Sequence, residues 1–192
     1  MARKVTAVVV CHDTGDYLQQ TLQALRRQTV APDSILLVDT SGRSIDSENP
    51  ALPELNDLPT LRLEPRVGLA ISLRAALHSD HITPDPEHWL WFLHDDSAPE
   101  PTCLAELLAA EETNALAAII GPKQVNWNDS RTIFQLGLTL TPGGTPLSPH
   151  AGELDQSQHD SLSDVMAVGT AGALIRTDVL TDLDGLNELA PP

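Results

Sequence analysis

Short apolar runs alternate along the chain with segments in which leucines recur at helical spacing. The apolar runs are bounded by polar turn residues, as is typical of strands buried on both faces of a sheet; they cover residues 6–10, 35–38, 61–63, 89–93 and 116–120. The leucine pattern predicts helices at residues 18–25, 69–77, 102–112 and 177–183. Strands that alternate with helices at this pitch predict βαβ units. We therefore expect an α/β fold with a mostly parallel sheet flanked by helices, formed as a single domain over residues 1–192.

Turn-forming residues set the expected limits of these elements. Asp16 is positioned to cap the start of the first helix. Residues 45–59 contain three prolines and little periodicity, so we expect irregular structure there. Gly143 and Gly144 predict a turn after the segment 134–140.

Aspartates follow three of the predicted strands. Asp13 lies in the loop after the first strand, Asp39 ends the second, and Asp95 and Asp96 follow the apolar run 89–93. Ligands of open α/β sheets bind beyond the carboxyl ends of the strands. Adjacent carboxylates repel each other unless a cation lies beside them, and Mg²⁺ or Mn²⁺ combines one or two carboxylates with phosphate oxygens and water. The pattern predicts a divalent metal and a diphosphate ligand at this edge.

Each acidic candidate also has a structural alternative. Asp96 or Ser97 could instead cap the helix that follows. Asp39 could accept hydrogen bonds from a ribose or a base, or it could cap a turn. The residues alone leave both pairs of alternatives open.

Other residues near the predicted strand ends are weaker candidates. Arg66 and Arg74 flank the expected helix start at Gly68, where they could face a diphosphate or lie as solvated arginines on the surface. Cys11 invites comparison with a nucleophile, but no partner base is in view, so a small buried side chain is the better interpretation.

A second group of possible ligands lies in the polar part of the chain. His150 and His159 share a loop with Asp155 and Asp160. This grouping could bind a metal, although exposed loops often have the same composition.

Charge and composition restrict the partners. The formal net charge of −16 argues against nucleic acid, because it repels a phosphate backbone. The two cysteines form no CxxC pair, so neither a disulfide framework nor a structural zinc is suggested, and a reducing compartment fits best. No apolar run has the length of a membrane span or an export signal. We expect these residues to be cytoplasmic and to lie outside the membrane.

The loop after the first strand lacks the glycine patterns of two common nucleotide-binding folds. It contains only Gly15, with neither GxGxxG nor GxxxxGK. This disfavours a Rossmann dinucleotide site and a P-loop. It also disfavours a nucleotidyltransferase, which should carry a Gly-rich loop with a lysine there.

Taken in chain order, several segments resemble the large inverting glycosyltransferase family called family 2, which has the GT-A fold. They are Cys11-His12-Asp13 with Tyr17-Leu18, Gln28-Thr29 with Pro32-Asp33, residues 35–39, Arg66-Val67-Gly68, His94-Asp95-Asp96, and residues 171–176 and 183–188. There are departures: Asp13 and Arg66 stand where the family usually has Asn, and His94 takes the first position of its D-x-D motif. Asp184, Leu186 and Asn187 replace the usual Gly, Phe and Asp of the family's Gly-Gly-Phe-Asp-Glu segment. Within this family, the sequence looks most like large actinobacterial members that continue into membrane-embedded regions.

The resemblance implies a UDP-sugar or dTDP-sugar donor and Mn²⁺ or Mg²⁺. The metal would bind Asp96, which matches the final Asp of D-x-D. The residues that would contact the nucleotide sugar are Cys11, His12, Asp13, Asp39, Arg66, Gly68, His94 and Asp95.

The resemblance also implies transfer of the sugar, with inversion, to a glycan or lipid-linked acceptor in cell wall polysaccharide biosynthesis. In this family the catalytic base follows the Gly-Gly-Phe-Asp-Glu region, so we expect the chain to stop before the acceptor and base segment, which would lie past Pro192. Membrane association would come through regions outside this chain. The alternative is a catalytically silent domain that acts as an interaction or regulatory module.

Overall fold

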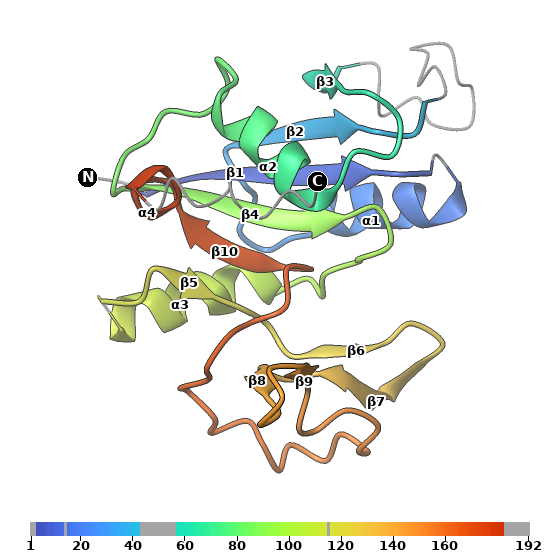
Figure 1. Cartoon of the computed structure of the whole chain (residues 1–192), viewed down its shortest axis with the longest axis vertical. Helices are drawn as coiled ribbons and strands as arrows, with labels where there is room; N and C mark the ends of the chain where they lie inside the picture. Colours follow the sequence, from blue (N-terminus) through green and yellow to red (C-terminus); the bar gives the residue numbers. More distant parts are fainter. Residues whose placement is uncertain (1–2, 14, 43–56, 115, 183–192) are drawn as a thin grey trace.

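The centre of the molecule is a six-stranded sheet (Figure 1). The computed structural model describes residues 3–13, 15–42, 57–114 and 116–182. The strands of the sheet are β1 (Lys4–Cys11), β2 (Ser34–Asp39), β3 (Thr60–Arg62), β4 (His88–His94), β5 (Ile119–Ile120) and β10 (Ala173–Arg176). Their order is β3-β2-β1-β4-β10-β5, in which β3, β2, β1 and β4 run parallel and β10 runs antiparallel to both of its neighbours. The predicted α/β fold with a mostly parallel sheet is confirmed.

Strand β1 lies between β2 and β4, and its register aligns the polar strand ends. Cys11 of β1 is paired with Asp39 of β2, and Val10 is paired with His94 of β4. The connections from β1 lead to β2 on one side, while β4 packs on the other, so the strand order reverses at β1. In open α/β sheets the crevice at such a reversal is the usual ligand site.

Helices cover both faces of this sheet, and the strands β1, β2, β4 and β10 supply side chains to both. Alternate residues of a strand point to opposite faces: Ala7 and Val9 pack with α1 (Asp16–Arg26) and α3 (Cys103–Thr113), whereas Val8 and Val10 pack with α2 (Leu69–Leu77) and α4 (Thr177–Asp182). Burial on both faces explains why the strands read as continuous apolar runs.

Two details of the expected elements differ in the structure. Helix α1 begins at Asp16 itself, with Gly15 as its N-cap and no side-chain capping bond, so Asp16 is not the cap. Its carboxylate lies in the first turn, where the positive end of the helix dipole stabilises a negative charge. The strand expected over residues 116–120 is reduced to Ile119–Ile120, because Leu116 is 97% exposed and the Ala117 N–H closes a turn onto the Asn114 carbonyl.

The part of the chain from 123 to 171 forms a small lobe beside the sheet, which we call the β6–β9 lobe (Figure 1). It contains two hairpins, β6 (Gln124–Asn126) with β7 (Asp129–Gln135) and β8 (Thr139–Leu140) with β9 (Pro146–Leu147). The turn predicted at Gly143 and Gly144 is confirmed between β8 and β9. The segment 134–140 is broken at Gly137, which has φ +66° and leaves no room for a Cβ beside Val165.

Some expectations fall on residues that the structure does not describe. They include most of the irregular segment 45–59 and the region that resembles Gly-Gly-Phe-Asp-Glu, both of which lie outside the described residues. None of the helices formed by the described residues has the length and apolar character needed to cross a bilayer.

Two leucines should differ clearly in how much their truncation destabilises the fold. Leu22 of α1 is 2% exposed and packs in the cluster beneath α1 and α3, whereas Leu116 is 97% exposed. We expect Leu22→Ala to lower the free energy of unfolding by about 2–5 kcal/mol through lost burial and a residual cavity. Leu116→Ala should change it by less than about 0.5 kcal/mol. Urea denaturation of both variants measures the difference, and equal midpoints would contradict the described packing.

Candidate functional site

The loop after β1 and the turn after β4 are joined by the carboxylate of Asp95. Its Oδ2 accepts hydrogen bonds from the backbone N–H groups of His12 and Asp13, both at 2.7 Å. The Asp95 N–H donates to the Val10 carbonyl at 3.0 Å, and its own carbonyl accepts the Thr21 hydroxyl at 3.0 Å. Asp95 therefore holds the β1 loop in place, and one of its oxygens is already used by the protein.

The end of β2 is connected to the same loop through Thr40. The buried Thr40 hydroxyl donates to the Cys11 carbonyl at 3.0 Å and so is left to accept the Nδ1–H of His12 at 2.7 Å. The neighbouring Asp39 is 4% exposed, and its Oδ1 accepts from the backbone N–H and the hydroxyl of Ser41. Asp39 thus closes a turn, which is the structural role that the sequence left open. It also lies at the carboxyl end of β2, where an acceptor for a ribose or a base would have to lie.

Asp96 is in a different environment from Asp95. It is exposed and lines a cleft of about 820 Å³ between the end of β4 and the β6–β9 lobe. Its carboxylate makes no hydrogen bond or ion pair with any residue that the structure describes. Of the two adjacent carboxylates, Asp96 is therefore the one available to an external cation.

Ser97 closes the turn that presents Asp96. Its hydroxyl accepts the His94 N–H at 2.8 Å and donates to the His94 carbonyl at 2.9 Å. Helix α3 begins only at Cys103, with Thr102 as the N-cap. The alternative in which Asp96 or Ser97 caps that helix is therefore wrong, because prolines at 99 and 101 delay the helix and Ser97 serves the turn.

His94 reaches across the cleft to Thr170, in the segment that precedes β10. Its Nε2 lies 3.0 Å from the Thr170 hydroxyl, and its ring packs edge-on to Phe92. Burial lowers the pKa of His94 below its usual value of 6.5, although the nearby Asp96 and Asp95 act in the opposite direction. His94 is therefore neutral at pH 7 and provides no positive charge for a phosphate.

Arg66 and Gly68 lie on the side of the site formed by β2 and α2. The Arg66 N–H donates to the Thr40 carbonyl at 3.0 Å, and its φ of 62° places it in the left-handed region. A non-glycine residue held there marks local strain of a kind that often occurs at ligand sites. Gly68 is the N-cap of α2, whereas Arg74 is an exposed residue in the last turn of that helix, which favours the surface interpretation for Arg74.

The two cysteines are unsuited to nucleophilic chemistry. Cys11 is fully buried, and burial together with the carboxylates of Asp95, Asp39 and Asp13 raises its thiol pKa far above the usual value. Burial raises the pKa of Cys103 to about 11. Because the reactive form is the thiolate, both behave as protonated side chains, and the interpretation of Cys11 as a small buried residue is confirmed.

Sequence reasoning missed the wall of the cleft opposite Asp96. That wall includes Lys123, Trp127, Thr170 and Gly169. Trp127 also packs edge-on against Tyr17 of α1, with ring centroids 4.9 Å apart, which connects the lobe to the main domain. The available signal was Gly169 in an apolar stretch, since a Cβ there would collide with the side chains of Gln135 and Gln124.

The loop histidines and aspartates separate into two groups in the structure. Asp155 and Asp160 form ion pairs with Lys123, with N–O distances of 2.8 and 2.7 Å. His150 and His159 instead contact Glu153. Neither group lies at the strand ends that carry Asp39 and Asp96.

Removal of the Asp95 carboxylate should loosen the β1 loop. We expect Asp95→Ala to lower the free energy of unfolding by about 1–2 kcal/mol, because two N–H groups lose a charged acceptor in a partly exposed position. Asp95→Asn should cost less, since an amide oxygen can still accept both bonds. Asp96→Ala is the matched control and should stay within about 0.5 kcal/mol of the parent. Chemical denaturation gives the comparison, and equal losses for both alanine variants would rule out the clamp.

The lowered pKa of His94 makes stability depend on pH in a defined direction. The unfolded chain takes up the proton near pH 6.5, whereas the folded chain does so only at lower pH. The stabilisation from neutral His94 is therefore complete above pH 6.5 and is lost as the pH falls below it. NMR titration should show an imidazole with a pKa below 6.5 whose signals vanish in His94→Gln. The same variant should reduce the fall in unfolding free energy between pH 7 and pH 5, and an unchanged fall would contradict the assignment.

Known proteins resemble this chain in sequence over most of its length. The family profile described as Glycosyl transferase family 2 matches residues 6–178. Galactofuranosyltransferase GlfT1 of Mycobacterium tuberculosis is 33% identical over 157 residues, which is 80% of this chain and 51% of that protein. The protein of the same name from Mycolicibacterium smegmatis is 29% identical over 133 residues, or 67% of this chain and 42% of that protein. The chain thus spans about half the length of these relatives or less.

Solved structures share the fold at low sequence identity. The crystal structure of S. aureus TarS 1-349 has a TM-score of 0.58 at 14% identity and covers 98% of this chain and 50% of that chain. Its complex with UDP-GlcNAc has a TM-score of 0.57 at 15% identity, with coverage of 98% and 48%. These likenesses establish the GT-A fold that the sequence predicted. Together with the profile match over most of the chain, they show that the chain belongs to glycosyl transferase family 2.

Proposed function

We propose that the chain binds a nucleoside-diphosphate sugar and a divalent metal at the carboxyl ends of β1, β2 and β4, as the donor-binding part of a glycosyltransferase. The observation that carries this proposal is the difference between two aspartates on neighbouring strands. Asp39 is buried and held in a turn at the edge, whereas Asp96 is exposed on the cleft with no protein partner among the described residues. One suits recognition of a neutral hydroxyl or base, and the other suits a cation.

The charges around the site require a cation if a diphosphate is to bind. Asp13, Asp39, Asp95 and Asp96 surround the strand ends, and His94 is neutral. Arg66 lies beside Thr40, and its guanidinium is our candidate for direct contact with the diphosphate or the sugar. Asp96 would hold Mg²⁺ or Mn²⁺, whose charge would neutralise the repulsion between these carboxylates and the diphosphate.

In the proposed arrangement, each part of the donor has its own set of residues. Asp39 and Asp13 hold the nucleoside, with His12 and Cys11 forming the backbone around it. Gly68, at the start of α2, allows the ligand to approach the helix N-terminus, where N–H groups face an anion. His94 and Asp95 border the sugar and orient the turn, while Asp96 binds the metal.

The reaction that we propose is a single displacement at the anomeric carbon with inversion of configuration. A base takes the proton of the acceptor hydroxyl as the diphosphate leaves, and a metal held by Asp96 would supply charge stabilisation for that leaving group. The cleft beside Asp96 is our candidate for the acceptor, a glycan or a lipid-linked sugar, because exposed Trp127 and Phe134 offer apolar surface of the kind on which sugar rings pack. None of the described residues is assigned as the base.

The relatives narrow the donors that should be tested first. Two relatives carry the name galactofuranosyltransferase, and S. aureus TarS was solved with UDP-GlcNAc and with UDP. We therefore propose a UDP-sugar, with a galactofuranosyl donor as the first choice and dTDP-sugars as the alternative. A cytoplasmic setting, with membrane association through regions outside this chain, completes the proposal.

Isothermal titration calorimetry with UDP-sugars and dTDP-sugars tests donor binding. We expect binding to strengthen when Mn²⁺ or Mg²⁺ replaces EDTA. Asp96→Ala should abolish that metal-dependent gain, lowering affinity by at least about tenfold, because even loss of an indirect metal partner has an effect of this size. Asp39→Ala should weaken binding both with metal and with EDTA.

Asp164→Ala is the matched control, since Asp164 is an exposed aspartate of the β6–β9 lobe away from the strand ends. It should leave donor binding unchanged. Metal-independent binding that Asp96→Ala does not alter would overturn the assignment of the metal ligand. A folded chain that binds no donor under any condition would instead support the silent interaction module.

A further inference from the structure

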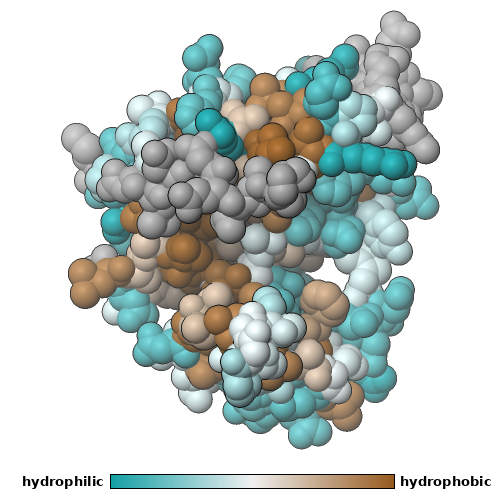
Figure 2. All heavy atoms as spheres, viewed as in Figure 1, coloured by the Kyte–Doolittle hydropathy of each residue, from teal (hydrophilic) through white to brown (hydrophobic). Residues whose placement is uncertain are grey.

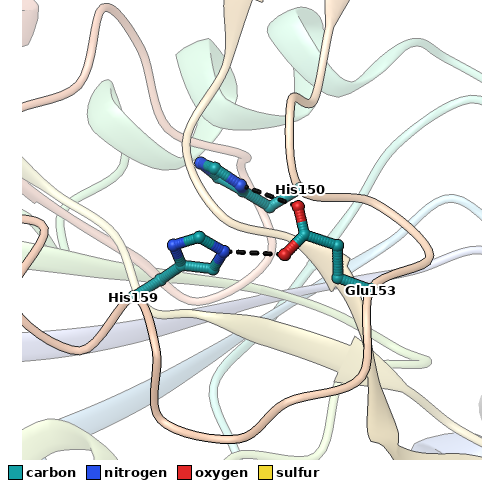
Figure 3. Close-up of side chains that lie close together, drawn as sticks. All are labelled: His150, Glu153 and His159. Atoms are coloured by element: carbon teal, nitrogen blue, oxygen red, sulfur yellow. Dashed lines mark hydrogen bonds and ion pairs between the residues drawn. The ribbon is translucent and has the colours of Figure 1, made fainter.

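Three side chains in the β6–β9 lobe bring metal-ligand atoms together outside the donor site. His150 Nδ1 lies 3.1 Å from Glu153 Oε1, and His159 Nε2 lies 2.8 Å from Glu153 Oε2. The two imidazole rings lie with their centroids 3.9 Å apart and their planes tilted by 38°. Figure 3 shows both rings facing the same carboxylate, and the three ligand atoms all lie within 4.8 Å of one another.

The lobe that carries this cluster has almost no hydrophobic core. Ile133 is the one buried side chain between residues 121 and 171, a range that the structure describes in full. Most of its large apolar side chains are instead exposed, and Figure 2 shows hydrophobic surface in the lower part of the molecule, where this lobe lies. The exposed residues include Phe134, Leu140, Leu147, Leu154, Leu162 and Met166. Apolar burial therefore contributes little to holding this part of the chain together.

Polar side chains occupy the interior positions that apolar ones leave. Between residues 140 and 167 no residue is buried, and the only partly buried ones are polar: Thr141, Ser148, His150, Asp155 and His159. Two of these are the histidines of the cluster, and a third is paired with Lys123. Small units without a sufficient core are commonly stabilised by a metal or another crosslink. Two of the five partly buried side chains between residues 140 and 167 are thus imidazoles suited to such a crosslink.

The backbone holds the three ligands at separate points of the lobe. Glu153 is attached to β7, since the Ile133 N–H donates to its carbonyl and the Gly152 N–H donates to the Ile133 carbonyl, both at 2.9 Å. His150 precedes it in a turn, and His159 begins another turn, in which the Leu162 N–H donates to the His159 carbonyl at 3.0 Å. A single ion at the cluster would connect both turns to β7.

The spacing and the chemistry of the ligands suit one class of ion. In a tetrahedral zinc site with ligands about 2.0–2.1 Å from the metal, neighbouring ligand atoms are about 3.3 Å apart. The two nitrogen–oxygen separations are of similar size, 3.1 Å from His150 to Oε1 and 2.8 Å from His159 to Oε2, so a small rotation of the carboxylate brings one oxygen within reach of an ion bound to both rings. Imidazole nitrogens favour Zn²⁺ and similar transition metals, whereas Mg²⁺ and Ca²⁺ prefer oxygen. From these observations we propose that His150, Glu153 and His159 form a zinc-type metal site that crosslinks the β6–β9 lobe, with water in the fourth position.

The hydrogen bonds of the cluster are compatible with such a site. The Glu153 carboxylate accepts from both histidines and from the side-chain amide of Gln158, as an ionised carboxylate does. In the structure each histidine donates an N–H to Glu153, and the metal takes the lone pair of that same nitrogen once its proton has moved to the other ring nitrogen. Metal binding then needs no redox partner.

This site is distinct from the proposed donor metal in both position and chemistry. Asp96 offers an exposed carboxylate at the end of β4, suited to a hard ion that also binds phosphate. The lobe site offers two imidazoles and lies next to the ion pairs of Lys123, which lines the cleft. An ion here holds the wall of the cleft rather than the donor.

Zinc binding by the full 192-residue chain tests the proposal. We expect titration of Zn²⁺, followed by calorimetry and by elemental analysis after dialysis, to show one site that remains in Asp96→Ala. His159→Gln should lower zinc affinity by at least about tenfold. Glu153→Gln keeps the size of the side chain and its oxygen but removes the charge, so it should also weaken zinc binding. This variant tests the site even if His159→Gln fails to fold. His81→Gln, at an exposed histidine outside the cluster, is the matched control and should bind as the parent does.

Two further measurements separate this site from ordinary histidine binding. Zinc should raise the melting temperature of the parent and of His81→Gln but not that of Glu153→Gln, because only a ligand bound to the folded state stabilises it. Zinc-edge absorption spectroscopy should show two imidazole nitrogens. Unchanged zinc affinity in both Glu153→Gln and His159→Gln, or an affinity that Asp96→Ala alone abolishes, would overturn the proposal. Neither result would bear on donor binding, which is measured with Mn²⁺ or Mg²⁺.

Discussion

The geometry of the candidate donor site depends on the carboxylate of Asp95. It takes two backbone N–H groups from the β1 loop onto a single oxygen, while the Asp95 N–H donates to β1 itself. A loop that leaves a buried strand has several backbone groups without partners, and an ionised acceptor is an effective way to satisfy them. Because Asp95 and Asp96 are adjacent, the same turn that holds the β1 loop also presents Asp96 to the cleft. The proposed donor-binding loop and the proposed metal ligand are thus connected through one side chain.

Four aspartates lie around the ends of β1, β2 and β4, and they differ in the groups of the protein that they already bind. Asp95 is occupied by backbone amides and Asp39 by Ser41, whereas Asp96 faces open space. A cation that enters here meets one available carboxylate, which leaves most of its coordination shell for phosphate oxygens. This distribution fits a metal that is completed by its substrate better than one that is enclosed by protein.

The six-stranded sheet and the β6–β9 lobe are stabilised by different interactions. The six-stranded sheet buries continuous apolar strands under helices on both faces. The β6–β9 lobe leaves its apolar side chains exposed and places ion pairs and histidines in the partly buried positions. A wall built in this way can be adjusted by ligands or ions at little cost in hydrophobic energy. That property suits the side of a cleft where we propose that acceptors of varied shape bind.

The four parallel strands, the helices and the strand ends at which Asp39 and Asp96 lie could be predicted from the sequence, whereas the antiparallel strand β10 was not among the predicted strands. These features come from local patterns: apolar runs identify buried strands, leucine spacing identifies helices, and a polar residue after a run marks the carboxyl end. It also placed Arg66 and Gly68 near the site through the order of family motifs. The tertiary structure alone decided which of Asp95 and Asp96 is available, because the partners of Asp95 are amides more than eighty positions earlier in the chain. Only the tertiary structure, likewise, brings the side chains of His150 and His159 onto the carboxylate of Glu153 and places Trp127 and Thr170 along the cleft at the end of β4. Those pairings arise when turns and hairpins fold back on one another, and no local periodicity encodes them.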